Sequence, residues 1–149
     1  MRQPRETYYA ALFSKVSNSA GFVTKSRKLK HWTDTAPEEL PALFQAQKGE
    51  SVSQQKGVPA KWILHCDLYV YVHTLSQQLG DAYVTPSSLL NPLLDAIELA
   101  LAPDNLADNT CTLGGLVSHC WIEGMIETSE GTLGDHEVAI IPIAILVPS

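Results

Sequence analysis

The feature that most constrains the fold is the stretch AKWILHCDLYVYVHT at residues 60–74. Every second position is apolar, and these positions hold Trp62, Leu64, Cys66, Leu68, Val70 and Val72. Successive side chains of a strand point to opposite sides of a sheet, so this spacing predicts a long strand with one apolar face. The positions between them mix polar and aromatic types, namely Ile63, His65, Asp67, Tyr69, Tyr71 and His73. A mixed second face favours an antiparallel sheet that helices cover on one side only.

Two other segments have the spacing of amphipathic helices. Residues 4–19 start with Pro4, which suits the first position of a helix, and carry an apolar face made of Tyr9, Leu12, Phe13 and Val16. Residues 85–103 carry a second apolar stripe made of Leu90, Leu93, Leu94, Ile97 and Leu101. Asn91 and Pro92 suit either the start of this second helix or its restart after an interruption.

Four further segments are predicted to be extended. Residues 22–32 have β-branched and aromatic ends around a basic centre, which indicates a strand or an extended arm. Residues 41–50 read as a strand, and residues 116–125 alternate as a strand does. Residues 138–147 form the last strand, in which Pro142 removes a ladder donor and therefore predicts a sheet edge or a bulge.

The order of these elements is helix, two or three strands, helix, two strands, with polar connections at residues 51–59 and 127–137. This order predicts an α+β fold, in which a mainly antiparallel four- to five-stranded sheet has two helices packed on one face. The chain has 149 residues, and 45% of them are hydrophobic, which fits a single domain over residues 1–149 with one core.

The sequence indicates an intracellular protein. The first residues lack the continuous apolar stretch and the small-residue cleavage site of a signal peptide. The longest apolar run, at residues 138–147, is interrupted by a proline and is too short to span a bilayer, so no membrane partner is expected. The cysteines are odd in number, Cys66, Cys111 and Cys120, which favours a reducing compartment over a disulfide framework.

The net charge of −6 conceals a segregation of charge along the chain. All ten Lys and Arg residues lie between Arg2 and Lys61, where five acidic residues oppose them and leave a net charge of +5. Residues 62–149 hold eleven acidic residues and no Lys or Arg, a net charge of −11. This asymmetry indicates a charged partner or self-association, unless the two halves fold together and their charges intermingle.

The stretch TLGGLVSHCWIEG at residues 112–124 holds the residue types of phosphate loops and metal sites. A phosphate loop needs its glycines between a strand and a helix start, where backbone N–H groups face the ligand. Here the glycines precede strand-like alternation, and no lysine follows them. Gly114 and Gly115 are therefore interpreted as a bulge or a tight turn leading into a strand.

No metal site, cofactor or catalytic group is predicted. Neighbouring residues on a strand point to opposite faces, so the two members of His65–Cys66, and likewise of His119–Cys120, cannot bind the same metal ion. His65 and His119 could meet across strands, but two imidazoles without a carboxylate or thiolate partner form a poor site. No nucleophile motif such as G-x-S-x-G occurs. A small intracellular α+β enzyme remains the alternative from a different class of function.

One run of basic residues could contact nucleic acid, and it consists of Lys25, Arg27, Lys28, Lys30 and His31. The run lacks a helix-turn-helix or RNP pattern. The acidic remainder of the chain would also repel a polyanion. Specific nucleic-acid recognition is therefore not expected.

Several short blocks together resemble a known family, and they are KHWTDTAPEELPALFQAQKGE, LYVYVHT, NPLLDAIELAL, TLGGLVSHCWIEG and AIIPI. They are similar to the tail terminator proteins of long-tailed bacteriophages, also called tail completion or minor tail proteins, over roughly residues 27–147. The resemblance implies an α+β subunit of a hexameric ring that caps the head-proximal end of the tail tube. Such a ring ends tube polymerisation and provides the surface for head–tail joining. A virion protein of the tail or neck is implied, assembled in the host cytoplasm, without catalysis or cofactor.

The resemblance also implies partners: other copies of the chain, the tail tube protein and the head–tail connector protein, while DNA can pass through the ring. A head-to-tail ring joins two different patches of each subunit, and segregated charge suits such a contact. The hypothetical basic patch contains Arg27, Lys28 and Lys30. The hypothetical acidic patch contains Glu123, Glu127, Glu130, Asp135 and Glu137. An exposed Trp121 between His119 and Glu123 suits an interface better than a catalytic pocket.

The polar loops at residues 51–59 and 128–135 are second candidates for contacts with the tube or the connector, because long polar loops often carry binding sites. Another neck protein, such as a head-closure or connector subunit, remains an alternative within the same class, since composition does not separate the two.

Overall fold

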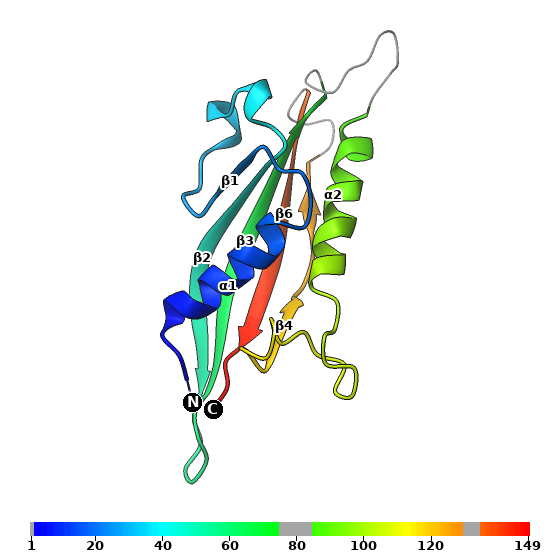
Figure 1. Cartoon of the computed structure of the whole chain (residues 1–149). Helices are drawn as coiled ribbons and strands as arrows, with labels where there is room; N and C mark the ends of the chain where they lie inside the picture. The colour runs from blue at the N-terminus through cyan, green and yellow to red at the C-terminus, as the bar shows by residue number, and fades with distance from the viewer. Residues whose placement is uncertain (1, 75–84, 130–134) are drawn as a thin grey trace.

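The computed structural model describes residues 2–74, 85–129 and 135–149 (Figure 1). Within these residues lie two α-helices, α1 (Arg5–Ser17) and α2 (Pro86–Ala100). The strands are β1 (Thr24–Ser26), β2 (Ala42–Ser53), β3 (Lys61–His73), β4 (His119–Ile122), β5 (Glu127–Thr128) and β6 (His136–Leu146). Two short 3-10 turns, η1 (Trp32–Asp34) and η2 (Pro37–Glu39), connect β1 to β2. The predicted α+β fold is confirmed.

The strands form one six-stranded sheet in the order β1-β2-β3-β6-β4, with β5 also paired to β6. β1 runs parallel to β2, and every other pair is antiparallel. The sequence predicted four or five strands. The additional one is β5, whose two residues lie in the segment read as a hairpin connection and are too few to show alternation.

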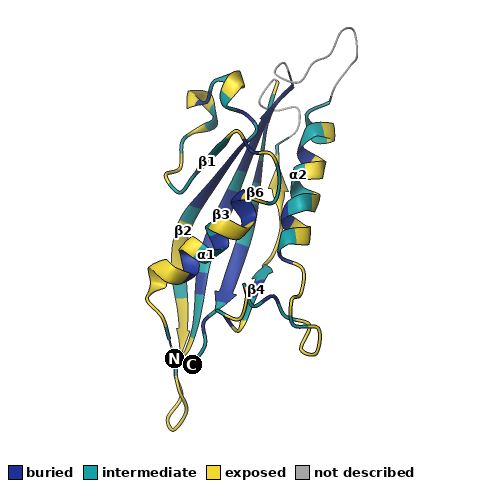
Figure 2. Cartoon of the chain, viewed as in Figure 1, coloured by how far each residue is buried: buried dark blue, intermediate teal, exposed yellow. Residues whose placement is uncertain are grey.

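Both helices lie on the same face of the sheet, as predicted, with α1 across β2 and α2 across β3 and β6 (Figure 1). The alternating face of β3 is buried beneath them in one core, shown dark blue in Figure 2. From α1 this core takes Tyr8, Tyr9, Leu12 and Val16. The buried Gln45 side chain of β2 donates a hydrogen bond of 2.9 Å to the Tyr9 carbonyl, which fixes the helix on the sheet.

The second face of the sheet is mixed, as the sequence predicted, but part of it is covered by the chain itself. The chain between β1 and β2 folds back over this face, and the Tyr71 hydroxyl donates a 2.7 Å hydrogen bond to the Lys30 carbonyl. Beneath this arm lies a second, smaller apolar cluster of Leu40, Ala42, Phe44 and Tyr71. We call residues 27–34 the arm.

Helix α2 begins at Pro86 after the N-cap residue Thr85, so Asn91 and Pro92 neither start nor restart it. Pro92 lies inside the helix, where its missing N–H removes one bond to the carbonyl four residues earlier. Its ring is exposed, and the helix continues past it to Ala100. The apolar stripe of the following turns holds the helix on the sheet despite the proline.

Pro142 lies in the sheet interior, not at an edge, because β6 is flanked by β3 on one side and by β4 and β5 on the other. Its carbonyl accepts the N–H of Glu123 at 2.9 Å. The nitrogen of a strand residue points to the same side as its carbonyl, so the missing N–H faces the gap where β4 ends and β5 has yet to begin. The proline therefore loses no bond to β3, and the one bond that it cannot return, to Glu123, lies just past the end of β4.

Two predicted boundaries were also wrong. β2 continues to Ser53, so residues 51–53 belong to the strand and only the rest of the predicted 51–59 loop is a hairpin turn. β4 is four residues long, because the turn before it occupies the start of the predicted 116–125 strand. In that turn Gly114 and Gly115 have φ values of 77° and 90°, which confirms the tight turn.

The β2–β3 hairpin and the pair formed by His73 and His136 lie at opposite ends of the sheet. The hairpin leaves the sheet beside Lys61 at one end of β3, and His73 and His136 are paired at the other end (Figure 1). The 13 residues of β3 span roughly 43 Å at about 3.3 Å per residue. Residues 130–134 of the second predicted polar loop lie outside the described residues.

Candidate interaction surfaces

The two charged halves of the sequence are also two sides of the molecule. The basic segment supplies α1, β1 and β2, and the acidic segment supplies α2, β4, β5 and β6, with β3 between them (Figure 1). Among the described residues one ion pair crosses between the halves, from Lys48 to Asp67 at 3.4 Å. The charges are therefore segregated in space as well as along the chain.

The basic arm is partly neutralised within the chain. Arg27 forms two hydrogen bonds to the Glu6 carboxylate at 2.5 and 3.0 Å, and these bonds lower the pKa of Glu6. Lys30 forms an ion pair with Glu39 at 3.2 Å. Lys28 and the neighbouring Lys25 are exposed and take part in none of the ion pairs found among the described residues. Of the predicted basic patch, Lys28 is thus the freest cation.

Strand β4 brings together the three residues predicted to form a contact face. The rings of His119 and Trp121 are stacked with centroids 4.9 Å apart, and the Trp121 indole N–H donates to the Glu123 carboxylate. The Cys111 backbone N–H donates to Nδ1 of His119 at 3.1 Å, which places the proton of a neutral imidazole on Nε2. The aromatic pair is held rigidly and remains partly exposed.

The predicted acidic residues do not form one patch. Glu127 is exposed on β5, at the same sheet edge as the exposed Glu123. The Asp135 carbonyl accepts the backbone N–H of Thr74 at 2.9 Å, at the far end of the sheet. Glu137 is only 1% exposed, on the helix-covered face, and therefore cannot contribute to a surface patch of the single chain. Glu130 lies outside the described residues.

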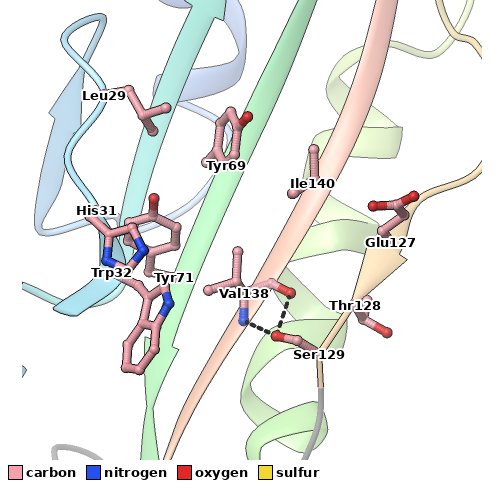
Figure 3. Close-up of a pocket in the computed structure, with 10 residues that line it drawn as sticks. All are labelled: Leu29, His31, Trp32, Tyr69, Tyr71, Glu127, Thr128, Ser129, Val138 and Ile140. Carbon is pink, nitrogen blue, oxygen red and sulfur yellow. Dashed lines mark hydrogen bonds between the residues drawn. The ribbon is translucent and has the colours of Figure 1, made fainter. Parts of the chain in front are cut away.

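The structure shows one surface that the sequence did not indicate, a trough of about 560 Å³ on the second face of the sheet. Figure 3 shows Leu29, His31 and Trp32 of the arm on one side and residues 127–129 on the other. Its floor consists of Tyr69, Tyr71, Val138 and Ile140. The floor residues follow the strand alternation, but the fold-back of the arm depends on long-range contacts that have no sequence period.

The glycine turn before β4 is bonded within the chain. The Asp104 carboxylate accepts the backbone N–H groups of Thr112 at 2.7 Å and Gly114 at 3.0 Å, together with the Thr112 hydroxyl at 2.9 Å. These bonds lower the pKa of Asp104 to about 2, with the Gly114 N–H as the largest cause. The amides that a phosphate would need are already occupied, because Gly115 N–H donates to the Thr112 hydroxyl at 2.9 Å.

The described residues contain no group of three or more His, Cys, Asp or Glu side chains that could hold a metal ion. All three cysteines are buried and free, and burial raises the pKa of the Cys66 thiol to about 12. A thiol that stays protonated is a weak nucleophile. Ser51 Oγ lies 2.9 Å from Nε2 of His65, but none of the hydrogen bonds found in the described ranges joins a carboxylate to this histidine. The triad geometry for nucleophilic catalysis is thus incomplete there.

No described helix has the length and apolar character needed to cross a membrane.

No protein-family model and no curated protein matches the chain. A similar fold occurs in a solved structure described as the virion of a native gene transfer agent (GTA) particle. One chain of that virion superposes with a TM-score of 0.54 and 11% sequence identity, over 95% of this chain and 94% of that chain. At this identity the likeness shows a shared fold.

Proposed function

We propose that this chain is a structural subunit of a phage-like virion and, within it, a tail terminator that forms a ring on the head-proximal end of the tail tube. The observation that carries the proposal is the end-to-end likeness to a chain of a gene transfer agent virion, which leaves out almost none of either chain. The likeness of the sequence blocks to tail terminators supports the narrower role.

The distribution of charge supports a ring. A closed ring needs a heterologous interface, in which one side of each subunit meets the other side of the next. The basic side and the acidic side of this chain are different surfaces and attract each other. Electrostatic complementarity of this kind sets the register and the encounter rate of subunits more than their final affinity.

The two ends of the sheet support a role between two partners. A terminator contacts the tube on one side of the ring and the head connector on the other. The β2–β3 hairpin and the end of the sheet at His73 and His136 are separated by a strand roughly 43 Å long, as such a role requires. Each is proposed to meet one of the two partners.

The proposed role involves no catalysis and no cofactor. The buried thiols and the Ser51–His65 pair without an orienting acid offer little to an enzyme mechanism. A connector or head-closure subunit is the second candidate, because its ring also needs two charged faces.

The proposal is tested by light scattering of the purified protein, alone and with tail tubes of the particle to which it belongs. We expect the tubes to stop growing and to gain a ring of about six copies of the 16.3 kDa chain at one end. Cryo-electron microscopy of the particle checks the position. Density elsewhere in the neck would move the chain to a connector role. Absence from the particle, together with a monomer that ignores the tube, would overturn the proposal.

Assembly should also slow as salt rises, because the contact is electrostatic. The Arg27→Glu, Lys28→Glu double variant should assemble more slowly at low salt. Since Arg27 also holds Glu6, the Lys25→Glu, Lys28→Glu variant is the matched change that leaves the internal ion pair intact. Normal assembly of both variants at low salt would contradict a role for the basic arm.

A further inference from the structure

The geometry points to a specific contact between subunits: β5 of one copy pairs with β1 of the next, so that the sheet continues around the ring. This inference rests on the proposed ring. It concerns the two free edges of the sheet, one at β1 (Thr24–Ser26) and the other at β5 (Glu127–Thr128). Among the described strands, β1 has β2 as its one neighbour and β5 has β6.

The two edges lie at the same position along the strand direction. Following the strand register across it, one row contains Lys25, Leu43, Val70, Ala139 and Thr128. The next row contains Ser26, Phe44, Tyr69, Ile140 and Glu127. Subunits of a ring are related by rotation without a shift along the axis. If the strands run nearly parallel to that axis, β5 of one copy therefore lies beside β1 of the next.

The strand directions also match. β1 runs with β2, β2 runs against β3, β3 against β6, and β6 against β5, so β1 and β5 have opposite directions within one chain. Rotation about the ring axis keeps these directions. The new pair is therefore antiparallel, with Ser26 opposite Glu127 and Lys25 opposite Thr128, and the backbone groups of both edges gain partners.

The side chains at the two edges are complementary. The β1 edge carries the exposed Lys25 and Lys28 with two exposed apolar residues, Val23 at 62% and Leu29 at 43%. The opposite edge carries the exposed acids Glu123 and Glu127 with Met125 at 78% and Ile126 at 36%. In this register Lys25 faces Thr128 and Glu127 faces Ser26, so no lysine directly opposes a glutamate. The two edges attract each other through their overall charge, and exposed apolar side chains at the contact become buried.

The same charges oppose the wrong pairings. Two β1 edges would bring lysines together, and two β5 edges would bring glutamates together, so pairing between like edges is disfavoured. When unlike edges pair, the growing oligomer keeps one open β1 edge at one end and one open β5 edge at the other. Subunits can therefore be added until the ring closes.

The pairing is tested by a disulfide between copies, in the double variant Ser26→Cys, Glu127→Cys under mild oxidation. Directly opposed residues of antiparallel strands have Cα atoms about 5 Å apart, which suits a disulfide. Within one chain these positions are separated by four strand spacings, roughly 19 Å, which excludes an internal bond. The native cysteines are buried and do not contribute.

The expected result on a non-reducing gel is a ladder that ends at the mass of the closed ring. Each single variant alone should give no ladder, and a mixture of the two single variants should give dimers only. The positional control is Lys56→Cys with Glu127→Cys, because Lys56 is more exposed than Ser26 but lies in the hairpin at the end of the sheet. It should cross-link at least tenfold more slowly.

The outcomes separate this inference from the proposed function. Rings seen by light scattering without a ladder from positions 26 and 127, or with an equal ladder from the control, overturn the strand pairing and leave the ring intact. An unlimited ladder that never stops at a closed ring supports the pairing and overturns the ring. A monomer that neither cross-links nor adds to tail tubes overturns both.

Discussion

The two faces of the sheet share the same strands but differ in what covers them. On the helix-covered face, the apolar positions of β3 and β6 are sealed in one continuous core by α1 and α2. On the second face, the arm covers only one end, over a small cluster that includes Phe44 and Tyr71. Beyond it lie the trough and the aromatic pair of β4, which remain partly exposed.

The burial that stabilises the fold therefore lies on one face of the sheet, and the exposed apolar side chains lie on the other. One face supplies the burial that a domain of this size needs. The other keeps aromatic and apolar side chains near the surface, beside polar residues such as His31, Glu127 and Thr128. Exposed apolar surface with a polar rim is typical of interaction sites.

The largest expected effect contrasts two neighbours on opposite faces of β3, Leu68 and Tyr69. Leu68 is 0% exposed in the core, so Leu68→Ala should lower the free energy of unfolding by about 2–5 kcal/mol. Tyr69 is only partly buried and lines the trough, so Tyr69→Ala should cost about 1 kcal/mol and act mainly on assembly. Urea unfolding measures both. Equal losses of stability would show that the second face is part of the folding core.

High pH should destabilise both faces through one tyrosine on each. Burial raises the pKa of Tyr9, under the helices, and of Tyr71, under the arm, from 10.0 to about 12. The folded protein favours the neutral form of each hydroxyl, so its stability is unaffected by these groups below pH 10 and falls as the pH rises from 10 towards 12. Between pH 10 and pH 12, the free energy of unfolding should fall less for Tyr9→Phe and for Tyr71→Phe than for the unmodified protein. An unchanged alkaline slope in both variants would refute this assignment.

The sequence predicted the helix-covered face well because burial there follows a period. The strict alternation of residues 60–74 located β3 and its buried side. The same rule brought His119, Trp121 and Glu123 together on one side of β4. Regular burial leaves a periodic mark in the sequence, so these parts could be predicted without a structure.

The second face was predicted poorly because contacts far apart in the sequence determine it. The arm reaches Tyr71 through a bond between residues 41 positions apart, and no local pattern signals that bond. Glu137 was a different error, because a signal existed. It has the same parity as Ala139, Ile141 and Ile143, which are buried on the helix-covered face, so alternation already placed it inward.

At neutral pH the same two tyrosines should respond differently to loss of the hydroxyl. The Tyr71 hydroxyl donates to the Lys30 carbonyl, so Tyr71→Phe should cost about 1 kcal/mol and increase hydrogen exchange in the arm. The Tyr9 hydroxyl is buried without a hydrogen-bond partner among the described residues, so Tyr9→Phe should be neutral or slightly stabilising. Thermal unfolding compares the two variants directly. A larger loss for Tyr9→Phe would mean that the hydroxyl under the helices has a partner in solution.

The smallest expected effect concerns the turn that leads into β4. This strand buries Cys120 in the core and carries the stacked His119 and Trp121 on the second face. Asp104→Asn keeps the shape of the side chain but removes the charge that the N–H groups of Thr112 and Gly114 now face. Because the group is fully exposed, the melting temperature should hardly change, and the effect should appear as faster amide exchange at these two residues. In the unmodified protein the protection of these amides, taken relative to the intrinsic exchange rate at each pH, should fall as the pH falls towards 2, where the folded-state pKa lies and the carboxylate takes up its proton. Since His119 accepts a bond from the neighbouring Cys111, the exchange of the Cys111 amide tells how far the disturbance spreads. If Cys111 stays protected while Gly114 exchanges freely, the aromatic pair on the second face is held by β4 itself. If both exchange together, the carboxylate of Asp104 helps to hold that contact surface in place.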